Sequence, residues 1–401
     1  MIKAIYLERY KKPLIAFCLL IIGILLINAK LQSDFWHQTA SYYQEDELAK
    51  QNFEKNKEDY SYWDETKQDN IPYKNFQEYA DTNLYVYQPS SKYYNPTEIP
   101  KAADYDQHET YISSSSDYSF VLLFLIPLAG FLLFFIDAKT GFNQLLFSLP
   151  TTRKELFVKK LLYVGGPIFL TILIGQALYA VLFHQLIPAP YMNATLGQLF
   201  VSVINYFFLL FLMFSASAFV GSMVGNLVFG PLTWFVFWIF MLFVPNSIYT
   251  ILEIVGLREK VMPSIPHNLF IIAVGKTGGY WWMSLLFLLL SVGFLFWAYT
   301  KYQTISLEND GNYLFNKESR WPIWLLMTSF CSLIIGTSFF SPWYSYYMNR
   351  SIGEATSIWE PISGSLLILV SVGIICYLLI FFPVIKKKLE QRRMHTKSLN
   401  I

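Results

Sequence analysis

The sequence predicts an all-α polytopic membrane protein with about eight transmembrane helices and a small polar ectodomain after the first of them. Hydrophobic residues make up 54% of the 401 residues and charged residues only 14%, whereas an average soluble protein is about a quarter charged. The apolar residues also gather in blocks of roughly 20, the length that crosses a bilayer as a helix. The blocks are Pro13 to Asn28, Ser119 to Ile136, Leu161 to Ile187, Leu199 to Met223, Phe229 to Pro245, Trp281 to Thr300, Trp321 to Phe340 and Ile362 to Pro383.

The placement of charge predicts the orientation of these helices. Four Lys or Arg precede Pro13, and six lie between residues 386 and 397. The segment from Lys30 to Tyr118 instead holds 17 acidic residues against 8 basic ones. Cytoplasmic segments of membrane proteins carry the excess of Lys and Arg. We therefore expect both termini in the cytoplasm and residues 30–118 outside, which agrees with an even number of spans.

This topology divides the chain into alternating segments. They are a cytoplasmic tail and first helix (1–29), an extracellular domain (30–118), a second helix (119–136), a cytoplasmic loop (137–160), helices three to six with an external segment at 246–279 (161–300), a cytoplasmic loop (301–320), helices seven and eight (321–383) and a basic cytoplasmic tail (384–401).

The first helix also resembles a signal peptide, because a basic start precedes an apolar run. Its end, Asn28-Ala29-Lys30, is a poor cleavage site, so we expect a retained anchor.

The ectodomain is predicted to be small and helical, with helical periodicity over Glu45 to Tyr62 and Phe76 to Tyr85. All three cysteines fall within predicted spans, which excludes a disulfide inside the ectodomain and favours small buried apolar roles. They are Cys18, Cys331 and Cys376. The ectodomain aromatics either pack the domain on itself or line a face that binds peptide or sugar. They include Tyr60, Tyr62, Trp63, Tyr73, Phe76 and Tyr79.

Residues 137–163 carry the most informative pattern in the chain. Four apolar residues recur at helical spacing and form one stripe on a short helix. They are Phe142, Leu145, Leu146 and Leu149. Pro150 ends this helix, because proline lacks an N–H and disfavours the α conformation of the residue before it.

A second helix is predicted directly after this corner. Thr152 and Glu155 have the spacing of a capping box, in which each side chain satisfies a free backbone N–H at a helix start. The new helix is basic and leads into the third span. Its basic residues are Arg153, Lys154, Lys159 and Lys160.

The stretch LLFSLPTTRKELFVKKLL resembles the loop between the second and third spans of ABC-2 type transporter permeases, the membrane subunits of bacterial ABC exporters. The resemblance extends from Met1 to about Thr300 in the order of anchor helix, external insert and helical bundle. It implies a cytoplasmic ATPase partner that binds ATP and Mg, and a second permease chain, either identical or a sister. It also implies that the stripe lies in a groove of the ATPase while Arg153 and Lys154 pair with acidic groups there. The exported cargo would be an amphipathic peptide, antimicrobial or lipid, in a bacterial plasma membrane.

Other classes of function find less support in the sequence. The closest approach to a phosphate-binding loop is Gly275-Lys276-Thr277, but Phe270 stands where the pattern requires glycine. We therefore expect no ATPase activity, cofactor or catalytic residue in this chain. The five histidines and three cysteines form no metal-binding spacing, and no GxSxG motif is present. Scarce ionisable residues within the spans count against an ion-coupled carrier or channel.

Three interpretations remain open. Ser217, Gly221 and Gly225 repeat at every fourth residue and allow close helix packing, either between two permease chains or within one bundle. The amphipathic helix at 142–149 docks a partner or rests in lipid headgroups. The whole chain is a transporter subunit or a membrane sensor whose ectodomain binds a ligand. Membrane lipid is an expected partner and nucleic acid is not.

Overall fold

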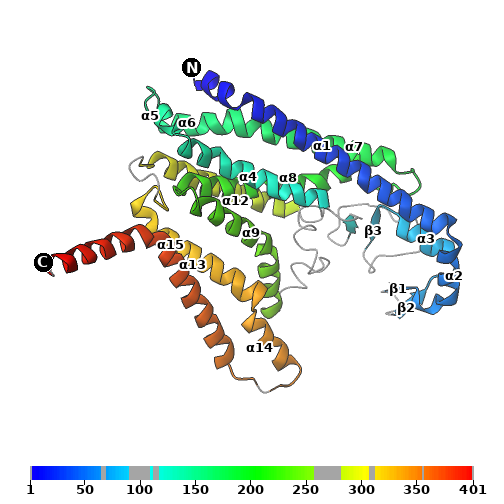
Figure 1. The fold of residues 1–401 in the computed structure, drawn as a ribbon. Helices are drawn as coiled ribbons and strands as arrows, with labels where there is room; N and C mark the ends of the chain where they lie inside the picture. The colour runs from blue at the N-terminus through cyan, green and yellow to red at the C-terminus, as the bar shows by residue number, and fades with distance from the viewer. Residues whose placement is uncertain are drawn as a thin grey trace. The chain divides into compact units, whose positions relative to one another are not determined.

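The computed structural model describes residues 2–64, 69–89, 109–111, 117–256, 281–306, 312–354 and 356–399. Within these residues, eight helices are long and apolar enough to cross a bilayer. They span Ile2–Glu45, Phe120–Lys139, Arg153–Leu186, Val203–Met223, Phe229–Ile254, Trp282–Gln303, Lys317–Ser351 and Trp359–Phe382. Each overlaps one predicted block, which confirms an all-α multi-pass membrane protein (Figure 1).

The chain divides into two compact units. The first consists of residues 1–126, 158–212 and 263–291, and the second of residues 127–157, 213–262 and 292–401. Four helices contain a boundary between the units: α4 (Asp117–Lys139), α6 (Arg153–Lys160), α8 (Leu196–Met223) and α12 (Trp281–Gln303).

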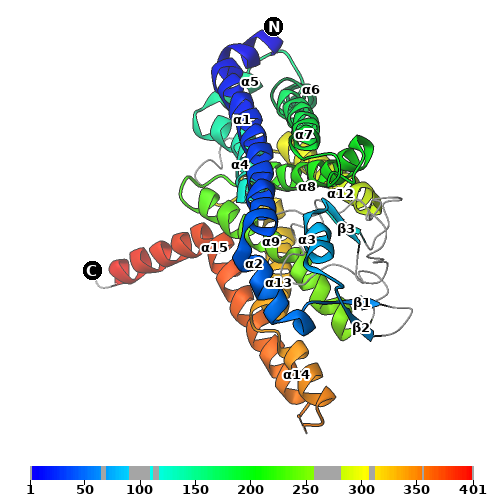
Figure 2. The ribbon, with the colours of Figure 1, turned by 90° about the vertical axis from the view of Figure 1, so that its right-hand side faces the viewer.

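Two long helices, α1 (Ile2–Glu45) and α7 (Gly166–Leu186), lie side by side in the first unit (Figures 1 and 2). The Cys18 thiol lies 4.0 Å from the Pro167 carbonyl, and His37 Nε2 lies 3.1 Å from the Leu186 carbonyl. Residues of α1 therefore pair with residues of α7 in the same order along the chain, so the helices run parallel. First and third spans must run in the same direction across a membrane, as these two do.

The predicted ectodomain begins as a continuation of α1, which extends well past the predicted end of the first span. It then forms α2 (Glu47–Lys55), the antiparallel pair β1 (Ser61–Asp64) and β2 (Asp69–Pro72), α3 (Phe76–Leu84), and the antiparallel pair β3 (Tyr87–Pro89) and β4 (Glu109–Tyr111). The helix predicted near Phe76 is present as α3, capped by Asn75. The prediction of a helix throughout Glu45 to Tyr62 is wrong, because Asn56 ends α2 and β1 pairs with β2 from Ser61.

The ectodomain aromatics pack against one another. The ring of Tyr79 lies 4.8 Å from Tyr60, 5.3 Å from Tyr73 and 5.4 Å from Phe53, which is almost fully buried. Burial, with a smaller contribution from the carboxylate of Glu78, raises the pKa of Tyr73 to about 12. These rings thus build the core of the domain, and Tyr62 and Phe76 join the same network. The side chain of Trp63 lies outside the described part.

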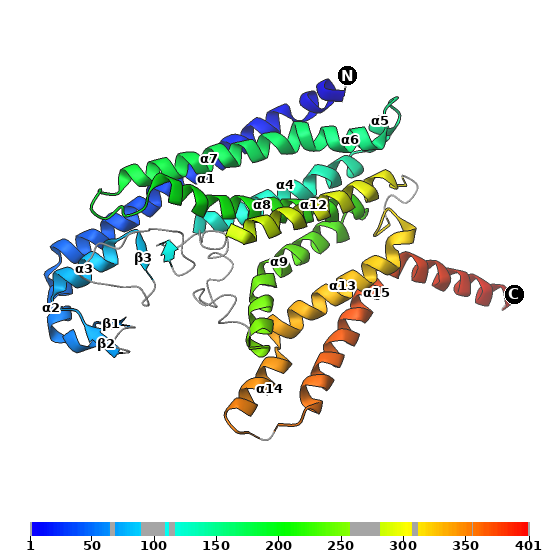
Figure 3. The same cartoon turned by 180° about the vertical axis from the view of Figure 1, so that it is seen from behind.

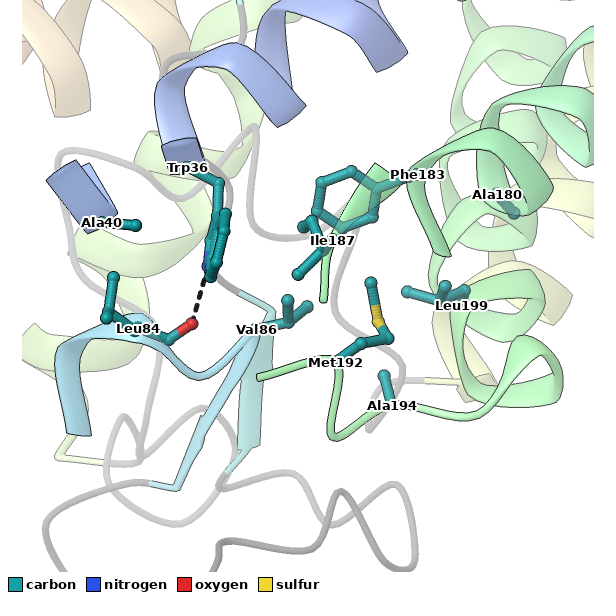
Figure 4. Packing of buried hydrophobic residues seen from close by; sticks show 10 residues of the cluster. All are labelled: Trp36, Ala40, Leu84, Val86, Ala180, Phe183, Ile187, Met192, Ala194 and Leu199. Atoms are coloured by element: carbon teal, nitrogen blue, oxygen red, sulfur yellow. Dashed lines mark hydrogen bonds between the residues drawn. The ribbon is translucent and has the colours of Figure 1, made fainter. Parts of the chain in front are cut away.

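A second core joins α1 and α3 to the connection between α7 and α8 (Figure 4). The Trp36 indole donates a 2.8 Å hydrogen bond to the Leu84 carbonyl. The ring of Tyr191 lies 5.5 Å from that of Trp36, and its hydroxyl donates to Asp81 at 3.0 Å and accepts from Gln44 at 3.1 Å. The buried residues are Trp36, Ala40, Leu84, Val86, Ala180, Phe183, Ile187, Met192, Ala194 and Leu199.

The described residues of the second unit also form α5 (Phe142–Phe147), α9 (Phe229–Ile254), α13 (Arg320–Ile334) with a π-helical continuation (Ile335–Phe339), α14 (Pro342–Ser351) and α15 (Trp359–Leu399), seen from behind in Figure 3. The predicted end of the fifth span at Pro245 is wrong, because α9 continues through this proline to Ile254. Residues 257–279 of the predicted external segment lie outside the described part.

Candidate functional site: the corner between α5 and α6

The predicted helix, corner and helix are all present. α5 begins after Gly141, whose φ of 69° is a left-handed conformation that glycine adopts without strain. It ends at Phe147, and residues 148–152 lead to α6 at Arg153. The Thr152 hydroxyl accepts the Glu155 N–H at 3.3 Å, so Thr152 is the predicted N-cap. A further π-helical turn, Leu161–Gly165, joins α6 to α7.

The four residues of the predicted stripe differ in exposure. Leu146 is completely buried, whereas 53% of Leu145 is exposed. Phe142 and Leu149 are half-buried. Leu146 therefore belongs to the core of this chain, and Leu145 is the residue of the stripe most available to a partner.

Arg153 is held within the chain. Its Nη1 donates hydrogen bonds to the carbonyl oxygens of Gln303 at 2.9 Å and Ile305 at 2.8 Å, at the end of α12. The last carbonyls of a helix have no partner within the helix and carry partial negative charge, which a guanidinium satisfies. The guanidinium also lies 4.2 Å from the centre of the Phe147 ring. Arg153 thus connects α5, α6 and α12, and the neighbouring Lys154 is exposed.

An aromatic cluster supports this connection. The ring of Tyr302, only 1% exposed, lies 5.7 Å from Phe147, 5.6 Å from Phe157 and 5.6 Å from Phe134. Phe134 and Phe157 stack at 4.9 Å. These residues do not stand out in the sequence. Their one signal is a pair of tyrosines three residues apart, Tyr299 and Tyr302, near the end of α12.

The small residues of α8 contact other segments of the same chain. The Ser217 hydroxyl accepts a 3.1 Å hydrogen bond from the Trp234 indole. At Gly221 a Cβ atom would collide with the backbone carbonyl of Phe131. Gly225 follows the end of α8, and its N–H donates to the Tyr313 carbonyl at 2.9 Å. These positions allow close packing within one bundle, the second of the two roles open from the sequence.

Comparison with known protein families, curated proteins and solved structures found no match to this chain. Among the described residues, no group of three or more His, Cys, Asp or Glu is placed to hold a metal ion. The corner can therefore be interpreted only through its own geometry. It presents an exposed leucine, Leu145 of α5, and an exposed lysine, Lys154 of α6, and Arg153 connects it to α12.

Proposed function

We propose that this chain is the permease subunit of a bacterial ABC exporter and that the corner between α5 and α6 receives the force of a separate ATPase subunit. The observation that supports this proposal most strongly is the pair of hydrogen bonds from Arg153 to the end of α12. A partner that moves the corner would move α12 with it, because Arg153 and the rings around Tyr302 connect the two. The pattern of residues 142–160, which resembles the loop of ABC-2 type permeases, supports the same proposal.

The proposed docking surface comprises Leu145, the half-buried Phe142 and Leu149, and Lys154. Leu145 supplies apolar area that a groove on the partner would bury. Lys154 supplies a charge that an acidic group on the partner would pair with. Arg153 takes a different role in this proposal from the one that the resemblance implies. It positions the corner from inside the chain and leaves contact with the partner to its neighbours.

We also propose the orientation of the chain in the membrane and the energy source for transport. Both termini and the corner lie in the cytoplasm of a bacterial cell, and the ATPase subunit binds ATP and Mg. A second permease chain completes the transporter. The cargo is amphipathic, such as a peptide, an antimicrobial compound or a lipid, because the spans offer aromatic and aliphatic surface and hardly any charge.

Purification of the chain from its native membrane in mild detergent tests the proposal. We expect a second protein with a phosphate-binding loop to copurify and to hydrolyse ATP in the presence of Mg²⁺. Recovery of a kinase instead would favour a membrane sensor. Recovery of the chain with no partner, under conditions that preserve other ABC transporters of the same membrane, would also contradict the proposal.

A further inference from the structure

Buried amide side chains lie on three long helices of the first unit. They are Asn28 on α1, Gln176 on α7 and Asn205 on α8. Their exposed fractions are 6%, 3% and 1%, respectively. Polar side chains in membrane helices commonly hydrogen-bond to a neighbouring helix. Asn205 follows this rule, since it accepts a hydrogen bond from the Ser284 hydroxyl of α12.

Gln176 differs from Asn205 in its hydrogen bonding. Both polar atoms of its amide, Nε2 and Oε1, are buried, and neither has a hydrogen-bond partner among the described residues. A buried amide without hydrogen bonds is strongly disfavoured, so nearly all such groups in native proteins have a partner. Gln176 lies at the midpoint of α7 (Gly166–Leu186), far from the water at either end of this helix. The side chain therefore indicates a polar group that the protein binds at this place.

The neighbouring turn of α1 places Asn28 beside this glutamine. Helices α1 and α7 run parallel, and a Cβ atom at Gly175 would lie 2.5 Å from a methyl carbon of Leu25, so the helices touch here. Asn28 follows Leu25 by three residues, and Gln176 follows Gly175 by one. Each residue of an α-helix is rotated by about 100° from the one before. These steps turn both amides to the same side of the contact.

Helix α8 brings Asn205 to the level of the same glutamine. The ring of Phe169 on α7 lies 4.8 Å from that of Phe211 on α8. Phe183, later in α7, shares a buried cluster with Leu199, earlier in α8, so these two helices run antiparallel. The glutamine is midway between the two phenylalanines of α7, and Asn205 is midway between Leu199 and Phe211. Three amides from three helices thus lie at one level of the first unit.

The chemistry of these side chains determines which ligand they suit. Amides are neutral, and the next buried residues on the same faces are aliphatic: Ile24 one turn before Asn28, and Ile172 one turn before Gln176. An ionised ligand is strongly disfavoured in such surroundings. A carboxamide has N–H donors and a C=O acceptor. Its complement is an uncharged group with one acceptor and one donor side by side, as in a peptide bond.

We propose that Gln176 binds an uncharged peptide bond of the exported cargo, with Asn28 as a second amide at the same place. The glutamine Oε1 accepts the N–H of the cargo, and Nε2 donates to its C=O. Ile24 and Ile172 contact the aliphatic side chains on either side of that bond. This inference rests on the proposed export function and narrows the cargo to apolar peptides.

The test uses the full chain in liposomes of phosphatidylethanolamine and phosphatidylglycerol with an uncharged dipeptide probe, N-acetyl-photoleucyl-leucinamide. Its diazirine links to neighbouring residues on illumination. We expect saturable cross-links on α1 near Leu25 and on α7 near Ile172, identified by mass spectrometry. N-acetyl-leucyl-leucinamide should compete, and its analogue with an ester in place of the central peptide bond should compete about tenfold more weakly, because one hydrogen bond is lost and one acceptor weakened.

Two further competitors define the class of ligand. Leucyl-leucine with charged termini should compete poorly, and equal competition would contradict an uncharged site. Octyl glucoside below its micellar concentration offers hydroxyl groups in place of a peptide bond. Competition by this glucoside as strong as by N-acetyl-leucyl-leucinamide would assign the site to hydroxyl groups and overturn the proposal.

A matched pair of variants separates ligand binding from a structural role. Gln176→Leu removes both polar atoms at similar volume, so the saturable cross-link should disappear while the melting temperature in detergent stays the same or rises. Gln185→Leu makes the same change at an exposed position of α7 and should cross-link as wild type does. A Gln176→Leu chain that melts below wild type and still binds the probe would show a structural amide bonded to water, which overturns the proposal.

The outcome for the peptide site is independent of the outcome for the proposed function. Recovery of an active ATPase subunit from a chain that gives no saturable cross-link would overturn the peptide site alone. A saturable cross-link that depends on Gln176, in a chain that recovers no ATPase, would support the site and overturn its role in ATP-driven export.

Discussion

The guanidinium of Arg153 lies over the ring of Phe147 at 4.2 Å while it donates to two carbonyls at the end of α12. Two properties of arginine meet here: a planar face that stacks and several donors. The arrangement connects the last residue of α5, the first residue of α6 and the last turn of α12.

Replacing Arg153 by Lys should loosen the corner although the charge is kept. An ammonium cannot stack as a plane or reach two carbonyls with the same geometry. Since hydrogen bonds to charged groups contribute about 1.5–3 kcal/mol each, we expect the unfolding free energy to fall by about 1–3 kcal/mol. Thermal unfolding in detergent measures this change. Lys154→Ala is the control, because the neighbouring Lys154 is exposed. Equal melting temperatures for Arg153→Lys and wild type would contradict the structural role.

Replacing Gly221 by Ala should destabilise the bundle. The added methyl group would meet the backbone carbonyl of Phe131, which cannot turn aside as a side chain does. Overpacking of this kind costs about 1–3 kcal/mol. Gly293→Ala on α12 is the matched control, since no atom lies within 4 Å of the added methyl group there. A melting temperature in detergent that falls equally in both variants, or in neither, would count against this packing.

The ectodomain core predicts a change of stability at high pH. The pKa of Tyr73 is raised from 10.0 to about 12, chiefly by burial. Tyrosine in the unfolded chain ionises near pH 10, so the stabilising contribution is complete below that pH and disappears between pH 10 and about 12. Absorbance at 295 nm of wild type minus Tyr73→Phe should show this hydroxyl ionising near pH 12. Ionisation near pH 10 would show that the ring is not buried as described.

The pattern of the sequence was sufficient to locate the spans and the corner. Blocks of apolar residues predicted eight helices, and Pro150 with Thr152 predicted the break and restart at α6. The sequence could not predict that Leu146 is buried and Leu145 exposed. Two adjacent leucines on so short a helix differ only in what surrounds them in the folded chain. The carbonyl acceptors of Arg153 lie about 150 residues away and carry no side-chain signal.

Two other differences between prediction and structure, in α9 and α8, also have local causes. Pro245 suggested the end of a span, but neighbouring helices can support a proline within a membrane helix, and α9 continues past it. The spacing of Ser217, Gly221 and Gly225 predicted close packing but not the residues that these three would contact. In the structure they contact Trp234, Phe131 and Tyr313, respectively.

The two adjacent leucines of α5 should respond differently to substitution. Leu146→Ala removes a fully buried side chain and should lower the stability of the chain by about 2–5 kcal/mol. Leu145→Ser changes a half-exposed side chain and should leave the melting temperature almost unchanged. Its effect should appear only when the partner is present.

Recovery of the ATPase partner by Leu145→Ser chains, at equal membrane expression, tests docking at the corner most directly. Burial of one leucine contributes up to about 1.5–3 kcal/mol, and each 1.4 kcal/mol is about a tenfold change in affinity. We therefore expect recovery at limiting partner concentration to fall about tenfold or more relative to wild type. Leu48→Ser in the ectodomain, where the leucine is 63% exposed, is the control and should recover the partner as wild type does. Equal recovery by Leu145→Ser and wild type would contradict docking at this corner.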